Sequence, residues 1–86
     1  MDDFKEFETI KQDVTIDMLP GICKCSDKDF ARVLGFCDNK HWNKVKLGKA
    51  KLNPARQAMI DSILWMYYRE HSMLLDWVQY RLSSQA

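Results

Sequence analysis

Hydrophobic residues recur along the chain at spacings that predict helices almost throughout. In residues 1–12, Phe4, Phe7 and Ile10 lie three positions apart among charged residues, which is typical of a short amphipathic helix. In residues 13–25, hydrophobic and polar residues alternate at first, and the alternation ends at Pro20. We therefore expect an extended connector there with room for one helical turn. The low content of turn-forming residues, 3 Gly and 2 Pro, likewise favours helices over an all-β fold.

Two short helices are predicted in the middle of the chain. The first covers about residues 27–34, with Ser26 as its N-cap and with Gly35 at the left-handed corner that ends it. The second covers residues 39–47, and Gly48 ends it in the same way. This arrangement is a packed helix, a tight corner and a second helix.

The second of these helices has an apolar face and a polar face. At about 100° per residue, Trp42 and Val45 fall together and should pack against the core, with the polar residues roughly opposite or beside them. Lysine can reach phosphates and guanine, and asparagine can pair with adenine. We therefore predict DNA base contacts from the polar residues of this helix, which are Asn39, Lys40, His41, Asn43 and Lys44.

Charge is unevenly distributed although the net charge is only +1. Residues 1–19 hold two Lys against six acids, whereas residues 20–53 hold eight Lys or Arg against three Asp. Such a local excess is the usual mark of a polyanion contact, although a solvated lysine-rich surface would give the same count. The predicted phosphate contacts are Lys28, Arg32, Lys46, Lys49 and Lys51.

Residues 26–53 resemble the helix-turn-helix core of Cro/repressor-type (XRE-class) regulators of phages and plasmids. The matching positions are the small residue of the first helix, the glycine at the turn, the two apolar positions of the recognition helix and the final glycine–basic pair: Ala31, Gly35, Trp42, Val45 and Gly48-Lys49. The resemblance covers about a third of the chain. It implies that helix 39–47 enters the major groove of DNA.

Residues 53–86 predict one long helix or a helical hairpin. Asn53 followed by Pro54 is a strong helix start. An unbroken helix would be ~45 Å long, so we expect it either to bend near residues 69–72, with Ser72 capping a second helix, or to project toward another chain.

Two adjacent apolar stripes on this segment predict a homodimer, because they offer more apolar surface than a small domain easily buries. A monomer core that buries all of them is the alternative. A two-fold dimer would suit palindromic half-sites ~34 Å apart. The predicted interface residues are Ile63, Met66, Tyr67, Leu74, Trp77 and Val78.

The cysteines allow one metal hypothesis. Cys23, Cys25, Cys37 and His41 could supply four zinc ligands, but the spacing is not a common finger pattern. We expect reduced thiols, with no metal and no cofactor. Neither a glycine-rich phosphate loop nor a Cys/His pair in a plausible cleft is evident, so we do not expect an enzyme.

Together these features predict an all-α fold: a compact helix-turn-helix domain of four to five helices. Residues 1–86 would form one domain, with an acidic N-terminal segment and connector (1–25), the helix-turn-helix (26–52) and a C-terminal helical dimerisation segment (53–86). The expected function is sequence-specific binding of double-stranded DNA as a transcriptional repressor. No apolar run approaches the ~20 residues of a membrane span, so we expect a cytoplasmic protein without a membrane partner.

An alternative function is open at this point. A small phage- or plasmid-encoded protein could instead bind and inhibit a host protein, through its acidic N-terminus (residues 2–17) or through the aromatic stripe of residues 63–82. The acidic segment could also fold back toward the basic face and weaken DNA binding.

Overall fold

The computed structural model describes residues 2–84, which form six α-helices, one 3-10 helix and no strand. The elements are α1 (Asp2–Asp13), the 3-10 helix η1 (Ile16–Met18), α2 (Leu19–Ile22), α3 (Asp27–Val33), α4 (Asn39–Lys46), α5 (Pro54–Arg69) and α6 (His71–Ser84). The all-α prediction is confirmed. Of the six α-helices in residues 2–84, the one-turn helix α2 exceeds the four to five expected, and the C-terminal segment forms the helical hairpin that was one of its two predicted forms.

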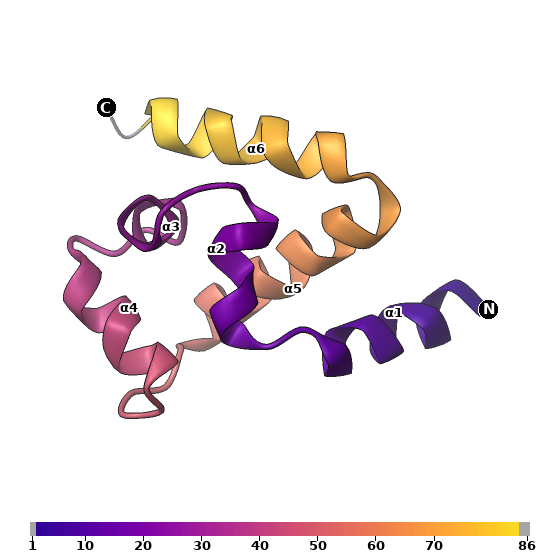
Figure 1. Ribbon diagram of the computed structural model, residues 1–86, viewed down its shortest axis with the longest axis horizontal. Helices are drawn as coiled ribbons and strands as arrows, with labels where there is room; N and C mark the ends of the chain where they lie inside the picture. Colours follow the sequence, from indigo (N-terminus) through magenta and orange to yellow (C-terminus); the bar gives the residue numbers. More distant parts are fainter. Residues whose placement is uncertain (1, 85–86) are drawn as a thin grey trace.

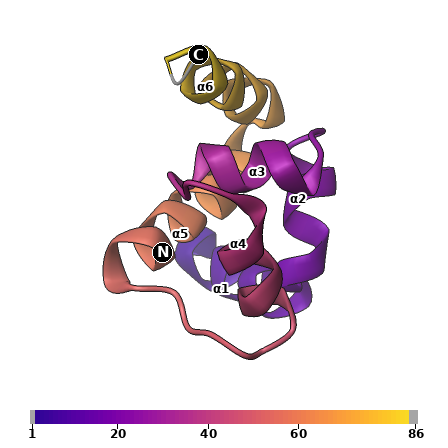
Figure 2. The ribbon, with the colours of Figure 1, turned by 90° about the vertical axis from the view of Figure 1, so that its left-hand side faces the viewer.

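The helices are arranged around α5, which runs through the middle of the molecule (Figure 1). α6 folds back to pack against α5 and α3, while α1 packs on α5. α4 lies at one end of the 38 Å long axis and α1 lies at the other (Figure 1). Figure 2 looks along this axis from the α4 end, with α4 in front of α1.

The hairpin between α5 and α6 turns at Glu70, which adopts an extended conformation (φ −161°, ψ 103°). Its carbonyl accepts the first N–H groups of α6, from Met73 (3.2 Å) and Leu74 (3.4 Å). Glu70 therefore occupies the N-cap position. The bend falls within residues 69–72 as expected, but the prediction that Ser72 caps α6 is wrong, since Ser72 lies inside the helix and its hydroxyl donates to Glu70 (3.2 Å).

One core lies where α3, α4, α5 and α6 meet. The rings of Phe30 on α3 and Trp42 on α4 pack at its centre, with centroids 4.9 Å apart. Both side chains are fully buried, as are Leu34 and Leu74 nearby. Because α4 contributes its two apolar residues to this core, the opposite side of α4 faces outward.

Three residues predicted at a dimer interface lie in this core instead. Ile63, Leu74 and Val78 are each 0% exposed. The turn at Glu70 folds α6 back onto α5, so these side chains are covered within one chain and cannot contact a second chain in this conformation. Of the six predicted interface residues, the corrected set keeps the three that remain at least partly accessible, which are Met66, Tyr67 and Trp77.

None of the helices in residues 2–84 combines the length and the apolar character that crossing a bilayer requires.

Candidate nucleic-acid interface

The corner between α3 and α4 is closed by backbone hydrogen bonds around a left-handed glycine. Gly35 has φ +89°. The N–H of Phe36 donates to the carbonyl of Ala31 (3.0 Å), and the N–H of Gly35 donates to the carbonyl of Arg32 (3.0 Å). These two bonds form a Schellman motif, in which only glycine avoids steric strain. The predicted corner at Gly35 is therefore confirmed.

Helix α4 begins and ends as its sequence indicates. The Asp38 carboxylate accepts the N–H of Lys40 (2.9 Å) at the N-cap. At the other end, Gly48 has φ +76°, and the N–H of Lys49 donates to the carbonyl of Lys44 (2.8 Å). Both ends of α4 are therefore satisfied locally.

Two arginines from the C-terminal hairpin hold the end of α3. Arg56 on α5 donates from Nε to the carbonyl of Leu34 and from Nη2 to that of Gly35, both at 3.2 Å. Arg81 on α6 donates from Nε to the carbonyl of Val33 (3.1 Å). These carbonyls form the negative end of the α3 dipole, which cations stabilise. Neither arginine could be found from the sequence, because helical periodicity carries no signal for contacts between distant helices.

Asp27 fixes the orientation of α4 against α3. Its Oδ1 atom accepts the indole Nε1–H of Trp42 (3.2 Å), and its Oδ2 atom pairs with Nζ of Lys46 (2.9 Å). The Lys46 hydrogen bond is the main reason why the pKa of Asp27 lies below its ordinary value. Trp42 and Val45 are buried, as periodicity predicts. α4 is thus anchored both by packing and by a charged contact.

The exposed face of α4 carries three of the five predicted base contacts. Lys40, Asn43 and Lys44 are all exposed, on the side opposite the buried Trp42. These three residues form the exposed stripe of α4. Leu47, at the C-cap of α4, continues this stripe and is 69% exposed. The prediction omitted Leu47, although its spacing of seven from Lys40 would have placed it on this face.

The other two predicted base contacts flank the stripe. His41 is exposed, and its ring stacks on that of Phe36 with centroids 4.9 Å apart and planes 27° apart. Asn39 is half-buried, and its Oδ1 atom is enclosed without a hydrogen-bond partner in residues 2–84. His41 is thus accessible beside the stripe, whereas Asn39 is only partly so.

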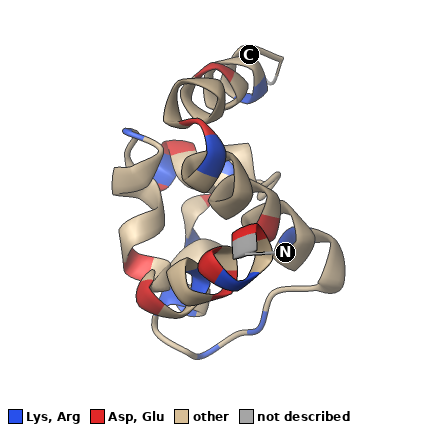
Figure 3. Ribbon diagram, turned by 90° about the vertical axis from the view of Figure 1, so that its right-hand side faces the viewer, with Lys and Arg blue, Asp and Glu red and all other residues tan. Residues whose placement is uncertain are grey.

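The predicted phosphate contacts divide into free and occupied side chains. Lys28, Lys49 and Lys51 are exposed, and Figure 3 shows basic residues along the loop that joins α4 to α5. Arg32 pairs with Asp29 (3.4 Å) and also donates to the carbonyl of Leu82 at 3.5 Å. Lys46 is held by its ion pair with Asp27. Arg32 and Lys46 therefore contribute to holding the fold.

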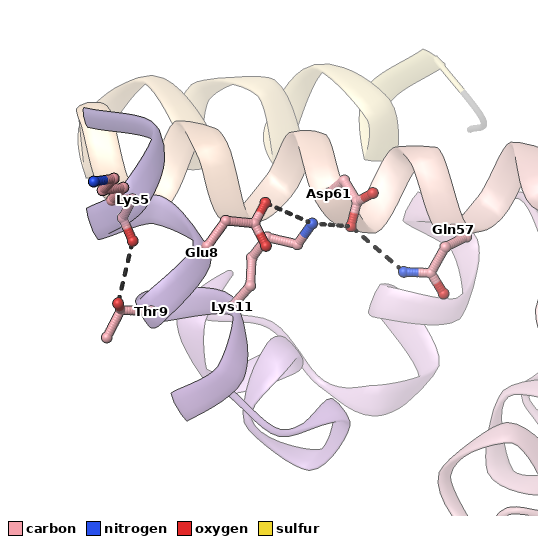
Figure 4. A network of polar contacts seen from close by, with 6 residues as sticks. All are labelled: Lys5, Glu8, Thr9, Lys11, Gln57 and Asp61. Atoms are coloured by element: carbon pink, nitrogen blue, oxygen red, sulfur yellow. Dashed lines mark hydrogen bonds and ion pairs between the residues drawn. The ribbon is translucent and has the colours of Figure 1, made fainter. Parts of the chain in front are cut away.

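The acidic helix α1 does not fold back onto α4. It packs on α5, where the rings of Phe7 and Trp65 meet nearly at right angles with centroids 4.9 Å apart. Lys11 lies 3.7 Å from both Glu8 and Asp61, and so links α1 to α5 (Figure 4). Helices α1 and α4 lie at opposite ends of the molecule (Figure 1).

The three cysteines are free and differ in their surroundings. Cys23 is buried, and burial, with a smaller contribution from Cys25, raises its pKa to about 12. Burial, followed by Asp29 and Asp27, raises the pKa of Cys25 to about 11. Cys37 is exposed. Among the described residues, no three His, Cys, Asp or Glu side chains gather as a metal site requires, so the geometry gives the zinc hypothesis no support.

An open groove lies along α5, and three of its lining residues, Met59, Met66 and Trp77, also pack against the core. Its volume is about 590 Å³, and its lining is mainly small or apolar: Ala55, Ala58, Met59, Asp61, Ser62, Trp65, Met66 and Trp77. Met66 and Trp77 belong to the corrected set of dimer-interface residues. The groove therefore gathers accessible apolar side chains of α5 and α6 on one surface.

Comparison of the chain with known protein families, with curated proteins and with solved structures finds no match. Its function is therefore inferred from the geometry of α4 and its surroundings.

Proposed function

We propose that this chain is a cytoplasmic, sequence-specific regulator of transcription, a repressor that binds double-stranded DNA with α4 in the major groove. One observation carries the proposal. The face of α4 opposite its buried residues presents Lys40, Asn43 and Lys44 to solvent, at spacings that align them along the helix.

The chemistry of this face suits base edges. An asparagine amide can make two hydrogen bonds to adenine, and lysine can donate to the O6 and N7 atoms of guanine. The major groove, ~12 Å wide, admits one α-helix. His41 stands at the edge of the stripe and extends the same surface.

The lysines around α4 suit the DNA backbone. Lys49 and Lys51 follow α4 directly and are exposed, and Lys28 is exposed on α3. Each phosphate that such a cation neutralises releases condensed counterions, so binding weakens as salt rises. Three contacts of this kind per chain predict a slope in log K against log salt of roughly −3 for a single chain and roughly −5 for a pair of chains.

The contacts behind α4 favour recognition as well. Asp27 holds α4 through Trp42 and Lys46, and Arg56 and Arg81 hold the end of α3. A helix fixed in this way loses little conformational freedom when it docks, which favours affinity and specificity.

A second copy of the chain is part of this proposal. Met66 and Trp77 line the groove along α5, and burying them against the same groove of a partner would remove apolar surface from water. A two-fold pair would present two copies of α4 to palindromic half-sites.

The test is selection from a randomised duplex pool at low salt, followed by sequencing of the bound fraction. The variants are wild type and Lys40→Ala/Asn43→Ala/Lys44→Ala. The control is Lys5→Ala/Gln12→Ala, which removes an exposed lysine and an exposed amide from α1. Circular dichroism establishes that each variant is folded.

The proposal expects one motif to be enriched by wild type and by the α1 control, and lost in the α4 variant. Enrichment of no motif by a folded wild type contradicts it. That result would favour a host-protein partner instead, since the acidic helix α1 presents Phe4, which is 60% exposed.

A further inference from the structure

Leu47 ends the exposed stripe of α4 with a side chain that cannot form hydrogen bonds. At 69%, it is the most exposed of the large hydrophobic residues in the described part of the chain. It lies seven residues after Lys40, four after Asn43 and three after Lys44, so it shares their face of the helix.

The backbone holds Leu47 in line with this face. Its φ and ψ are helical (−83° and 0°), and its N–H donates to the carbonyl of Asn43 (3.1 Å). Gly48 then turns the chain away with φ +76°. The side chain of Leu47 therefore projects from a fixed helical position, with the chain leaving behind it.

The residues around Leu47 decide what kind of partner it suits. An exposed leucine among acidic or neutral residues would suit a protein surface. Here its neighbours on the stripe are two lysines and an asparagine, and Lys49 follows in the loop. Cations and an amide suit a polyanion that carries hydrogen-bonding base edges, which is the major groove of DNA.

We infer that Leu47 determines part of the sequence specificity by contacting the C5-methyl group of a thymine in the major groove; this inference rests on the proposed function. Thymine is the one standard base that presents a methyl group in this groove. Leu47 covers that methyl group, and both groups leave water. The stripe thus combines hydrogen-bonding side chains with one apolar contact, and Leu47 selects a thymine at the step beside the bases that Asn43 and Lys44 contact.

The test uses the duplex enriched from the randomised pool and removes its thymine methyl groups one at a time. Each thymine is replaced by uracil, which keeps every hydrogen-bonding group and lacks only the methyl. Affinities are measured for wild type, for Leu47→Ala and for Met73→Ala, which truncates an exposed hydrophobic residue on α6.

The inference expects uracil at one thymine position per half-site to weaken wild-type binding about fourfold, the effect of burying one methyl group. Uracil at that position should weaken the binding of Met73→Ala by the same factor. It should not change the affinity of Leu47→Ala. Selection with Leu47→Ala should also relax the preference for that thymine.

Two results overturn the inference while leaving the proposed function in place. One is a bound duplex at which no uracil replacement matters, and the other is equal uracil sensitivity in wild type and Leu47→Ala. Failure to enrich any duplex overturns the proposed function and this inference together.

Discussion

The carboxylate of Asp27, the first residue of α3, lies 2.9 Å from the ammonium group of Lys46, the last residue of α4. The same carboxylate accepts the indole N–H of Trp42, one turn earlier on α4. One side chain therefore ties two turns of α4 to the start of α3, beside the packing of Trp42 and Val45 in the core.

Replacing Asp27 by asparagine should lower the free energy of unfolding by about 1 kcal/mol near neutral pH. Asparagine keeps an acceptor for Trp42 but removes the charge that faces Lys46. The value is modest because this ion pair is partly exposed. Chemical denaturation of wild type and variant measures the difference.

The same substitution should lose its effect in acid. Because the pKa of Asp27 is lowered in the folded state, its contribution is complete above the ordinary carboxyl pKa. As the pH falls below that value the unfolded chain takes up the proton first, and the contribution is gone once the pH passes below the lowered pKa. Denaturation repeated at falling pH should show a shrinking difference in the free energy of unfolding between wild type and Asp27→Asn. Asp29→Asn, which disrupts a weaker pair with Arg32, is the control, and an equal cost in both variants would contradict this role for Asp27.

Gly35→Ala should destabilise the protein by about 1–2 kcal/mol, because an alanine at φ +89° is strained. Crowding is not the cause, since an added Cβ would meet only the end of Arg81 at 3.9 Å. Gly21 provides the matched control: it is helical, and an added Cβ there would meet nothing within 4 Å. Gly21→Ala should be neutral or slightly stabilising. Equal losses of stability in both variants would contradict the assignment of a left-handed corner to Gly35.

The three thiols should react at very different rates in the folded protein. Cys37 is exposed, whereas Cys23 and Cys25 have pKa values raised to about 12 and about 11, so they hold almost no thiolate near neutral pH. A thiol reagent should modify one cysteine rapidly, and all three after denaturation. Cys37→Ser should remove the rapid phase. A rapid phase that persists in Cys37→Ser would contradict this, because it would place a reactive thiol at buried Cys23 or half-buried Cys25.

Met66→Glu should prevent association between copies of the chain. The substitution places a carboxylate in the apolar groove along α5. If a second chain covers the groove, that carboxylate loses its water, which is costly for an unpaired charge. Light scattering after gel filtration should give twice the chain mass for wild type and the chain mass for the variant. Tyr80→Glu, at an exposed site on α6, is the control. A wild type that remains a monomer at high concentration would contradict the dimer.

Local features of the fold could be predicted from the sequence because short-range chemistry determines them. The left-handed corners at Gly35 and Gly48 follow from helix-end chemistry, and the burial of Trp42 and Val45 follows from helical spacing. The helix start at Asn53 is of the same kind, since its side chain accepts the N–H of Arg56 (2.8 Å).

Contacts between distant segments could not be predicted in this way. Arg81 reaches Val33 across 48 residues, and nothing in the sequence near either one indicates it. The dimer prediction failed at Ile63, Leu74 and Val78 for a related reason. An apolar stripe must be covered, but periodicity does not say whether the same chain or a second one covers it. Because the chain turns at Glu70, α6 of the same chain covers these residues.

DNA binding by α4 can be measured directly by titrating isotope-labelled protein with a short duplex of mixed sequence at low salt and following the amide chemical shifts. Even non-specific binding, with a Kd of about 10⁻⁴ to 10⁻⁶ M at physiological salt, perturbs shifts at the contact surface. If α4 binds DNA, the largest changes fall on residues 39–51, around Lys40, Asn43 and Lys44, and α1 is unchanged. Changes centred on α1 or on the groove along α5, or no changes with excess duplex, would contradict it.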